Sequence, residues 1–575
     1  MLTEWLVASP APRAFFEALP DVHPLTAQVL YARGYRDPEA VRAFLDPPEP
    51  AAVRLTDLDR AVARLLRAIR QRERIAIYGD YDCDGVSAAA LMSETLAALG
   101  ADVRVHIPHR LEEGYGLNVE AIERLHAEGA SVIVSVDCGA RAFVEAERAR
   151  ALGVDLIITD HHALVDGQAP RAFAMVNPQR SEDAAFAELA GVGVAFQLAM
   201  RLLAEGEALG LLRDACTSEA LLDLVAVGTV ADVVPLTGVN RSLVRAGLQR
   251  LNTAPRLGLA ALVSAARLPM GAVHAGHVGF ALAPRLNAAG RLDTALHAYA
   301  LLVAREPELA SQLAQQLDAQ NAERQRITDH VSRAAELQAL AEDASPPLLF
   351  AASSEFNPGV IGLAAQRLVE RHHVPAVVVH VDGDRARGSC RSVEGFHITQ
   401  ALDHMRELFE KHGGHAAAAG FTLPASRLPM LRQQLYALAA AARPAGGWKR
   451  VLRAEAAIDL SALVQLVDVD GKAMHDLQRL EPHGAGNPRP LLLLHNAVVQ
   501  RVRRLGAGGE GGALHLHLQL RDRRRVIWDA VGWRLGHRAD ELREGAAVQL
   551  MAHIGITTWD GVRRLQVEVV DFRLS

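Results

Sequence analysis

Hydrophobic and polar positions change their period along the chain, and these changes predict its elements. Between residues 75 and 159, short apolar runs alternate with amphipathic stretches of helical period. Such alternation of strands and helices predicts a doubly wound parallel sheet. The predicted strands are 75–79, 103–107, 131–136 and 155–159, and the predicted helices lie near 86–99, 118–128 and 140–152.

The segments that flank this alternating region have helical patterns. Residues 1–70 are mostly helical in pattern and are interrupted by the prolines of DPPEP at 46–50, and residues 216–300 are also helical in pattern. Residues 308–345 contain neither proline nor glycine and follow Pro307, which suits the first position of a helix. A continuous helix there would be about 57 Å long at about 1.5 Å per residue. Its polarity suits a bridge between two lobes.

The C-terminal half begins with a second, smaller α/β pattern. Strands are predicted at 348–353 and 376–381, with a helix from 359 between them and glycine-containing stretches at 388–395 and 413–420. Residues 444–447 look like a linker, and the remainder predicts a small β-barrel. The strand-like runs of this barrel are 496–503, 513–520, 525–532, 547–556 and 563–573.

We therefore expect an α/β multidomain protein with five regions. They are an N-terminal helical region (1–70), a doubly wound α/β domain (71–300), a long connecting helix (301–345), a smaller α/β domain (346–446) and a C-terminal β-barrel (447–575).

Composition is consistent with several globular domains. The 575 residues correspond to about three to five domains, and half of them are hydrophobic. No apolar run reaches the roughly 18–20 residues of a membrane span. The N-terminus lacks the basic segment and apolar core of a signal peptide, so we expect a cytoplasmic protein. Four cysteines without a CxxC pair argue against a disulfide framework or a structural zinc site.

Charge is distributed unevenly around a net value of −6. Residues 449–575 contain 19 Lys and Arg against 15 Asp and Glu, so this part carries +4 and the rest carries −10. The excess is compatible with a solvated strand-rich surface or with a groove that follows phosphates. The basic clusters are Arg501, Arg503 and Arg504; Arg521, Arg523, Arg524 and Arg525; and Arg563 and Arg564.

Acidic residues follow three of the four predicted strands. In a parallel sheet these strand ends meet at one edge, where ligands bind at the topological switch point. The sequence therefore predicts a cluster of at least four carboxylates and two imidazoles. Its members are Asp80, Asp82 and Asp84; Asp137; and Asp160, His161 and His162, with Asp232 as a further candidate after a long apolar run.

Such a cluster requires cations, and its oxygen-rich ligands suit Mn²⁺ or Mg²⁺ better than zinc. If the strand continues, Asp82 and Asp84 point the same way, so each could hold a different ion while Asp137 bridges them. Two metals are typical of phosphodiester or phosphoanhydride hydrolysis. The DxDxDG run could instead open a calcium loop, but it follows a strand, and Leu91 stands where such a loop needs Glu.

Seven motifs occur in order between about residues 70 and 450. They are DYDCDG (80–85), VDCG (136–139), TDHH (159–162), TVADVVPL (229–236), APRLNAAGRLD (283–293), GSCRS (388–392) and GGHAAAAGF (413–421). Together they closely resemble the RecJ exonucleases of the DHH phosphoesterase superfamily. The resemblance implies a DHH domain and a DHHA1 domain that face each other across a groove, followed by an OB-like barrel.

The resemblance also implies an activity and a set of partners. It implies a 5′-to-3′ exonuclease that degrades single-stranded DNA to mononucleotides with Mn²⁺ or Mg²⁺, in recombinational, mismatch and base-excision repair. The implied partners are single-stranded DNA, preferably with a 5′-phosphate, a single-strand-binding protein and a RecQ-type helicase, with the enzyme as a monomer. On resemblance alone, residues 1–70 would pack on the DHH domain beside the DNA entrance.

Individual positions match the functional residues of that family. The matching metal ligands are Asp82, Asp84, Asp137, His161 and Asp232, and the adjoining catalytic residues are Asp80, Asp160 and His162. His162 could contact the scissile phosphate or the attacking water. The expected substrate-binding residues are Arg110, Tyr115, Arg285, Asn287, Arg291, Ser389, Arg391 and His415.

Several of these substrate roles have competing interpretations. Arg110, Arg285, Ser389 and Arg391 match positions near a 5′-phosphate, for which guanidinium groups are well suited. Tyr115 could stack on a base or could be a packed loop residue. His415 could contact a phosphate, or its glycine-rich motif could be a tight turn into a helix.

Three cysteines depart from the family pattern, where Ala, Asn and Gly are more usual. Cys83, Cys138 and Cys390 could be small buried residues, or their thiols could make the enzyme sensitive to oxidation. Two other functions also stay open: a phosphodiesterase or pyrophosphatase acting on small substrates, and a non-catalytic scaffold. The basic C-terminal barrel argues against the first, and the complete set of metal ligands argues against the second.

Overall fold

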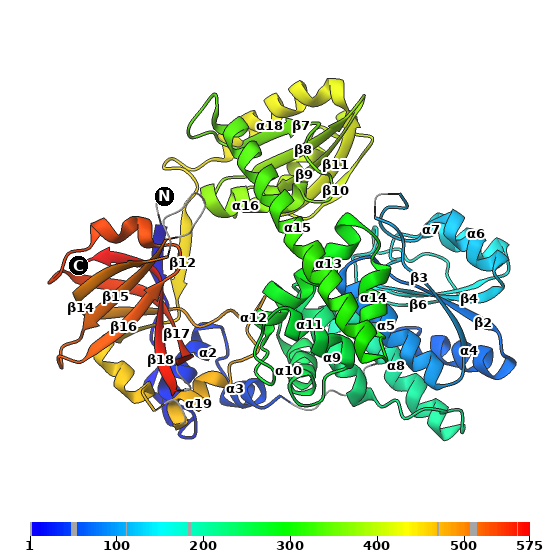
Figure 1. Cartoon of the computed structure of the whole chain (residues 1–575), viewed down its shortest axis with the longest axis horizontal. Helices are drawn as coiled ribbons and strands as arrows, with labels where there is room; N and C mark the ends of the chain where they lie inside the picture. Colours follow the sequence, from blue (N-terminus) through cyan, green and yellow to red (C-terminus); the bar gives the residue numbers. More distant parts are fainter. Residues whose placement is uncertain are drawn as a thin grey trace. The chain divides into compact units, whose positions relative to one another are not determined.

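The computed structural model describes residues 3–47, 54–110, 112–181, 186–468, 471–506, 514–559 and 562–575. The end of the DPPEP run and residue 513, the start of one predicted strand, lie outside these ranges. The chain forms two compact units, one of Glu49–Lys449 and one of Leu2–Pro48 with Arg450–Ser575 (Figure 1). Among the helices described, none is both long and apolar enough to cross a membrane.

The first unit begins with the predicted parallel sheet. Five strands lie in the order β3-β2-β4-β5-β6, and every pairing is parallel. The fifth strand was not predicted because its three residues are too few to show a period. The strands are β2 (Arg74–Tyr78), β3 (Asp102–His106), β4 (Ala130–Val136), β5 (Asp155–Thr159) and β6 (Ala174–Val176).

Helices cover both faces of this sheet, which explains the continuous apolar runs of its strands. Ile75 and Ile77 of β2 belong to one core with α4, α5 and α8, whereas Ala76 and Tyr78 belong to another with α6 and α7 (Figure 1). Successive residues of a strand point to opposite faces, so one strand serves both cores. The helices are α4 (Leu58–Gln71), α5 (Cys83–Ala98), α6 (Val119–Ala127), α7 (Phe143–Ala151) and α8 (Gly191–Ala208).

A helical region and the predicted long helix follow. The long helix α15 (Pro307–Leu340) has 34 residues, about 51 Å at about 1.5 Å per residue, so it ends earlier than the 308–345 stretch suggested. It packs against α13 of the first lobe, which is the parallel sheet with its surrounding helices, and against α16 (Ile361–His372) of the second lobe, which is described next. The preceding helices are α9 (Ser218–Ala231), α10 (Gly238–Thr253), α11 (Leu257–Ala265), α12 (Ala275–His277), α13 (Ala283–Leu292) and α14 (Leu296–Leu302).

The second lobe is a mixed five-stranded sheet in the order β10-β11-β9-β8-β7. Only β7 and β8 are parallel, and the other pairs are antiparallel. The glycine-containing stretches contribute to β9 and to the β10–β11 hairpin. The elements are β7 (Leu349–Ser353), α16 (Ile361–His372), β8 (Ala376–Asp382), β9 (Arg385–Arg391), α17 (Ile398–Asp403), β10 (Lys411–Gly414), β11 (Ala418–Pro424) and α18 (Leu428–Ala442).

The second unit contains the predicted barrel. Five strands follow one another in the order β14-β15-β16-β18-β17, and pairing of β17 with β14 closes the barrel. Closure removes the unpaired edges that an open sheet would leave. The elements are β12 (Arg450–Ala454), β13 (Ala456–Asp459), α19 (Lys472–Gln478), β14 (Leu492–Leu505), β15 (His515–Arg521), β16 (Ile527–Gly532), β17 (Ala547–Trp559) and β18 (Val562–Leu574).

The N-terminal segment corrects the expectation that residues 1–70 form one region on the first lobe. Only α4 joins that lobe; the earlier elements share a hydrophobic core with the barrel. β1 also pairs in parallel with β12, and the Arg33 guanidinium lies 2.6 Å from the Glu455 carboxylate. The apolar faces of these helices indicated burial but could not indicate the partner. The elements are β1 (Thr3–Val7), α1 (Arg13–Glu17), α2 (Pro24–Ala32) and α3 (Pro38–Leu45).

We predict that Leu30→Ala destabilises the barrel unit, because Leu30 of α2 is fully buried in the shared core. The expected loss is about 2–5 kcal/mol, as for other buried leucines. Urea unfolding followed by tryptophan fluorescence measures it, since four of the five tryptophans lie in the barrel unit. Leu574→Ala is the matched control because Leu574 is 58% exposed. Equal midpoints for the two variants would contradict the shared core.

Candidate metal centre

The acidic residues lie at the carboxyl ends of β2, β4 and β5, where the strand order reverses between β2 and β4. This is the switch point at which ligands bind in such sheets. β2 ends at Tyr78, and Asp82 is the N-cap of α5, so the strand does not continue through the aspartates as expected. The Asp82 Oδ1 atom accepts hydrogen bonds from the backbone N–H groups of Asp84 (3.0 Å) and Gly85 (3.1 Å). This cap moves the helix start to Cys83, earlier than predicted.

Asp84 is held by the N-terminus of α8, a contact that the sequence did not reveal. Its two carboxylate oxygens accept hydrogen bonds from the backbone N–H groups of Gly191 (2.7 Å) and Val192 (2.9 Å). Unpaired amides at a helix N-terminus favour negative charge. A Cβ atom at position 191 would lie 2.4 Å from the Asp137 Oδ1 atom, so only glycine fits there. The glycine-rich start of α8 was visible in the sequence, but nothing there indicated that it would contact Asp84.

Asp160 orients the tandem histidines. Its Oδ1 atom accepts hydrogen bonds from the backbone N–H groups of His161 (2.8 Å) and His162 (3.1 Å) and lies 2.8 Å from the His162 Nδ1 atom. Its Oδ2 atom accepts one from the N–H of Ala140 (2.6 Å). The Tyr115 hydroxyl lies 3.2 Å from the His162 Nδ1 atom, and the two rings meet edge to face. Asp160 is thus a positioning residue for His162.

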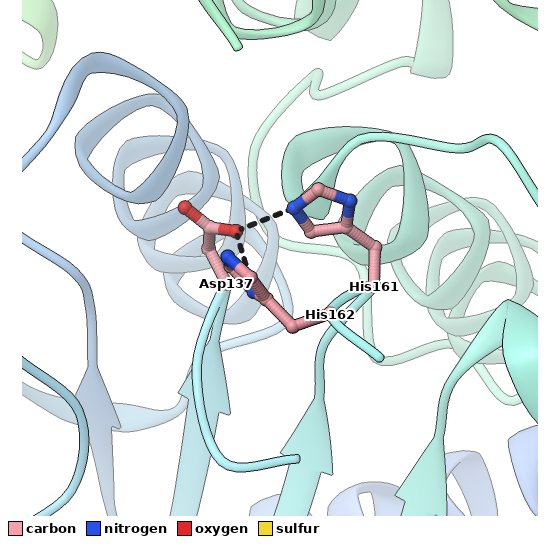
Figure 2. Close-up of side chains that lie close together, drawn as sticks. All are labelled: Asp137, His161 and His162. Carbon is pink, nitrogen blue, oxygen red and sulfur yellow. Dashed lines mark ion pairs between the residues drawn. The ribbon is translucent and has the colours of Figure 1, made fainter. Parts of the chain in front are cut away.

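Asp137 lies between the two imidazole rings. Figure 2 shows its carboxylate pointing toward both, with Oδ1 at 3.3 Å from the His161 Nε2 atom and 4.0 Å from the His162 Nδ1 atom. The His161 Nε2 atom also lies 3.5 Å from the Asp232 Oδ2 atom. Asp137 has a left-handed backbone with φ of 62°, which turns its side chain off the end of β4.

Ligand atoms of the predicted residues form overlapping groups that could each hold an ion. The atoms of each group lie within 4.8 Å of one another. Asp82 and Asp84 fall in different groups, as expected, whereas Asp137 is shared by two groups that do not include Asp84. Two ions bridged by Asp137 therefore stay a prediction. The groups are Asp84, His161 and Asp232; Asp80, Asp82 and Asp137; and Asp137, His161 and His162.

Burial and mutual repulsion raise the pKa values of the clustered carboxylates. Burial and the negative charge of Asp82 raise the pKa of Asp84 to about 7, and burial with the charges of Asp84 and Asp82 raises that of Asp232 to about 8. The pKa values of Asp80 and Asp137 are raised by the same two causes. The metal-free site therefore binds protons near neutral pH, where isolated carboxyl groups have none.

The two histidines are shifted in opposite directions. Burial and the charge of His162 lower the pKa of His161 to about 4, so His161 is neutral and can ligate a metal. Burial alone would lower the pKa of His162, but the hydrogen bond and negative charge of Asp160 outweigh burial and raise it to about 9. Burial would raise the pKa of Asp160, yet its contacts with His162 keep it below the ordinary value. These pKa values suit the expected roles, a metal ligand at His161 and a proton carrier at His162.

Unsatisfied polar atoms test whether these residues fit metal ions. Among the residues that the structure describes, the buried Asp80 Oδ1, Asp137 Oδ1 and His161 Nε2 atoms have no hydrogen-bond partner. Buried polar atoms are almost always paired, so three orphans at one place indicate that a ligand completes them. Carboxylate oxygens with one imidazole are a donor set for Mn²⁺ or Mg²⁺. The residues present fit the predicted ions.

Part of the expected substrate-binding set lies beside the acidic loop. The Arg110 guanidinium lies 4.8 Å from the Tyr81 ring centroid, and Tyr115, half exposed, contacts His162 as described above. The Asn287 Oδ1 atom accepts a hydrogen bond from the Cys83 N–H (2.8 Å), so Asn287 positions the start of α5. Arg291 donates to the Gly359 carbonyl (3.2 Å), which joins α13 to the second lobe.

The other expected residues have different surroundings. Arg285 forms an ion pair with Asp318 (2.7 Å). Ser389 and Arg391 lie together on β9, where the Arg391 Nη1 atom donates to the Ser389 hydroxyl (3.1 Å). His415 is exposed in the turn of the β10–β11 hairpin, so the alternative of a turn into a helix is wrong. Contact of these four side chains with DNA stays a prediction.

Arg387 is a basic residue of this region that the motifs did not include. Residues 385, 387, 389 and 391 share one face of β9, because alternate residues of a strand point the same way. The positive charge of Arg387 acts on the Tyr81 hydroxyl beside the acidic loop. The alternation of exposed arginines along 385–391 was the signal that could have identified it.

The three unusual cysteines are packing residues. Cys83, Cys138 and Cys390 are buried, and burial raises the pKa of each thiol, that of Cys390 to about 12. Cys83 is the first residue of α5. Buried thiols of raised pKa are unreactive, which favours packing over a redox role.

Three family descriptions match this chain. They are the DHH family, N-terminal domain (residues 74–229), the DHHA1 domain (345–441) and the RecJ OB domain (460–571). The single-stranded-DNA-specific exonuclease RecJ of Bacillus subtilis is 36% identical over 96% of this chain and 68% of its own length. The chain belongs to the RecJ family.

A second RecJ supports the fold as well as the sequence relationship. The Thermus thermophilus protein is 35% identical over 99% of this chain and 78% of its own length. Its crystal structure in complex with Mn²⁺ has a TM-score of 0.83 and covers 99% of this chain and 79% of that one, and another is in complex with Mg²⁺. The predicted fold class, a RecJ arrangement of DHH, DHHA1 and OB domains, is confirmed.

We predict that Gly191→Ala in this RecJ-family chain weakens metal binding by about 10–100-fold, the usual effect of losing an outer contact of a metal site. The added methyl group would displace the Asp137 carboxylate. Calorimetric titration with Mn²⁺ measures the affinity. Gly193→Ala on the same helix is the control, because its methyl group meets only the flexible end of Leu189 at 3.1 Å. Equal affinities of the two variants would contradict the proposed packing.

We also predict that the metal-free protein loses stability as pH rises from about 6.5 to 8.5. Folded Asp84, Asp232 and His162 retain protons to pH values of about 7, 8 and 9, respectively. The unfolded chain loses those protons at lower pH, so each group lowers the free energy of unfolding by up to about 1.4 kcal/mol per pH unit. Mn²⁺ should reverse the trend, because it displaces the protons.

Thermal unfolding in EDTA and in Mn²⁺ across this pH range tests the prediction. Asp232→Asn is the informative variant, since it removes one titrating group and should flatten the decline in EDTA. A melting temperature in EDTA that stays constant or rises between pH 6.5 and 8.5 would show that the carboxylates are ionised without metal.

Proposed function

We propose that this protein is a single-stranded-DNA-specific exonuclease that acts in the 5′-to-3′ direction and releases mononucleotides. The observation that carries the proposal is a set of buried atoms of Asp80, Asp137 and His161 that have no hydrogen-bond partner among the described residues. They lie at the switch point of a RecJ-family DHH domain. Membership of a family whose curated relatives are named single-stranded-DNA-specific exonucleases supports the substrate.

Mn²⁺ or Mg²⁺ is the proposed cofactor, with two ions. Divalent cations bound there lower the pKa of water and neutralise charge that develops on phosphoryl oxygens. The proposed ligands are Asp82, Asp84, Asp137, His161 and Asp232, and Asp80 lies within the group that contains Asp82 and Asp137.

Each of the remaining site residues has a separate task. Asp160 holds the His162 ring, and the raised pKa keeps a proton on that ring near neutral pH. His162 can therefore donate a hydrogen bond or a proton to an oxygen of the scissile phosphate. Tyr115, which contacts His162 and is half exposed, offers a surface on which a base can stack.

Groups that carry positive charge would bind the phosphates of the strand. Arg110 and Arg291 lie next to the acidic loop, and Ser389 and Arg391 form a polar pair on the DHHA1 sheet. Selection of a 5′-phosphorylated end by Arg110, Arg285, Ser389 and Arg391, and a phosphate contact of His415, are parts of the proposal. Roles in recombinational, mismatch and base-excision repair, a monomeric state and partnership with a single-strand-binding protein and a RecQ-type helicase rest on the family resemblance.

The test is product analysis on two internally labelled oligodeoxynucleotides that differ only in the 5′-phosphate. Each is offered single-stranded and duplex with Mn²⁺. We expect mononucleotides from the 5′ end of single strands only, with faster cleavage of the phosphorylated strand. Asp82→Asn should reduce the rate more than about 100-fold, since even outer partners of a metal cost about 10–100-fold.

The variant preserves the fold because asparagine is also a good N-cap. Asp59→Asn is the matched control, because the Asp59 side chain is 85% exposed on α4 and pairs only with Arg201 among the described residues. Release from the 3′ end would overturn the polarity. Cleavage of dinucleotides without action on long strands would assign the chain to the small-substrate phosphodiesterases.

A further inference from the structure

Four arginines gather where α13 and α16 pack against the connecting helix α15. Two of them have carboxylate partners: Arg285 pairs with Asp318, and Arg367 pairs with Asp329. The other two are Arg291 of α13 and Arg324 of α15. Neither forms an ion pair with any carboxylate in the part of the chain that the structure describes. The junction therefore contains two guanidinium groups that no direct ion pair among the described residues neutralises.

The side-chain contacts of this unneutralised pair are few. Arg291 donates from Nη1 to the Gly359 carbonyl (3.2 Å), and Arg324 donates from Nη2 to the Asn321 side chain (2.7 Å). The Nε atom of Arg324 is buried and has no hydrogen-bond partner within the described part of the chain. A guanidinium group has five N–H donors in a fixed plane, so most of the donors of both residues remain available to a ligand.

Electrostatic repulsion within the junction supports this interpretation. Burial and the charges of Arg110 and Arg324 lower the pKa of Arg291 to about 9. Burial and the charges of Arg367 and Arg285 lower the pKa of Arg324. Arginine otherwise stays charged under all ordinary conditions, so lowered pKa values of this kind reflect cations that are both buried and crowded together. An anion would relieve the repulsion and complete the hydrogen bonds together.

The junction lies close to the acidic centre. Gly290, next to Arg291, packs so closely on the Tyr81 carbonyl that a Cβ atom would lie 2.6 Å from it. Tyr81 stands between Asp80 and Asp82, and Arg110 lies over its ring. An anion bound by Arg291 would thus be a near neighbour of the acidic loop. The observation favours an anion that is connected to the reacting phosphate over an unrelated one.

We propose that Arg324 and Arg291 form a binding site for a phosphate group of the single-stranded substrate. The proposal rests on the proposed function and assigns a new role to the connecting helix, which would hold the substrate as well as join the two lobes. Guanidinium groups bind phosphate oxygens through paired, charge-assisted hydrogen bonds. A backbone phosphodiester and a terminal phosphate share this chemistry.

The experiment measures equilibrium binding of oligothymidylate to the full chain in EDTA, over a series of KCl concentrations. One oligonucleotide carries a 5′-phosphate and the other a 5′-hydroxyl group. Each phosphate contact contributes about 0.7 to the slope of log K against log salt for single strands. We expect Arg324→Gln to reduce the slope by about 0.7 and to weaken binding about fivefold at 0.1 M KCl.

Arg326→Gln is the matched control, because Arg326 lies two residues away on α15, is exposed and pairs with Glu323. It should leave both the slope and the affinity unchanged. Arg324→Lys retains the charge but loses the planar fork, so it should retain the slope and weaken binding. If Arg324→Gln melts at a lower temperature than the unmodified chain, the comparison is made with Arg324→Lys instead.

The outcomes separate this proposal from the proposed function. A reduced slope with both oligonucleotides supports a backbone phosphodiester at Arg324, and a reduced slope with only the phosphorylated one supports a terminal phosphate. If the unmodified chain binds single strands and Arg324→Gln behaves like Arg326→Gln, the inference is overturned while the exonuclease stands. If the unmodified chain binds no single-stranded DNA, both fail.

Discussion

Repulsion among buried carboxylates is the constraint on which the catalytic lobe depends. Asp80, Asp84, Asp137 and Asp160 are almost completely buried within three neighbouring strand ends, where water cannot screen their charges. Each is stabilised differently: Asp84 by the N-terminus of α8, Asp160 by backbone amides and a charged imidazole, and the others by protons or metal ions. The sheet, the helix N-terminus and the tandem histidines are arranged around this requirement.

The arginines near the acidic loop do not form direct ion pairs with its carboxylates in the part of the chain that the structure describes. Arg110 lies over the Tyr81 ring, and Arg291 follows Gly290, which packs on the Tyr81 carbonyl. Arg387, on β9 of the second lobe, acts electrostatically on the Tyr81 hydroxyl. Direct arginine–aspartate pairs would neutralise the carboxylates and occupy the places that metal ions and phosphates need. Paired arginines of the same unit, such as Arg64 with Glu73 and Asp155, serve the fold instead. The separation keeps the centre able to accept cations and anions.

Strand ends could be predicted from sequence because their signal is local. Short apolar runs between helical stretches mark β2, β4 and β5, and the parallel topology then brings their last residues together without knowledge of any contact. The cap formed by Asp82 was missed because aspartates spaced by two also suit a strand. Gly191 lies more than a hundred residues from Asp84, and nothing local connects them. The packing of α2 on the barrel was not predicted for the same reason. An apolar helix face indicates burial but not the element against which the helix packs.

The arrangement of the two units has a consequence for synthesis on the ribosome. The barrel unit is assembled from Leu2–Pro48 and Arg450–Ser575, so the catalytic unit is inserted between its two segments. Paired residues such as Thr3 of β1 and Arg450 of β12 are 447 positions apart in the chain. That separation corresponds to roughly 22–90 s of translation at about 5–20 residues per second. During that time the apolar faces of α1, α2 and α3 have no barrel to cover them. The apolar side chains of Leu2–Pro48 must therefore stay protected from aggregation until Arg450–Ser575 has been synthesised.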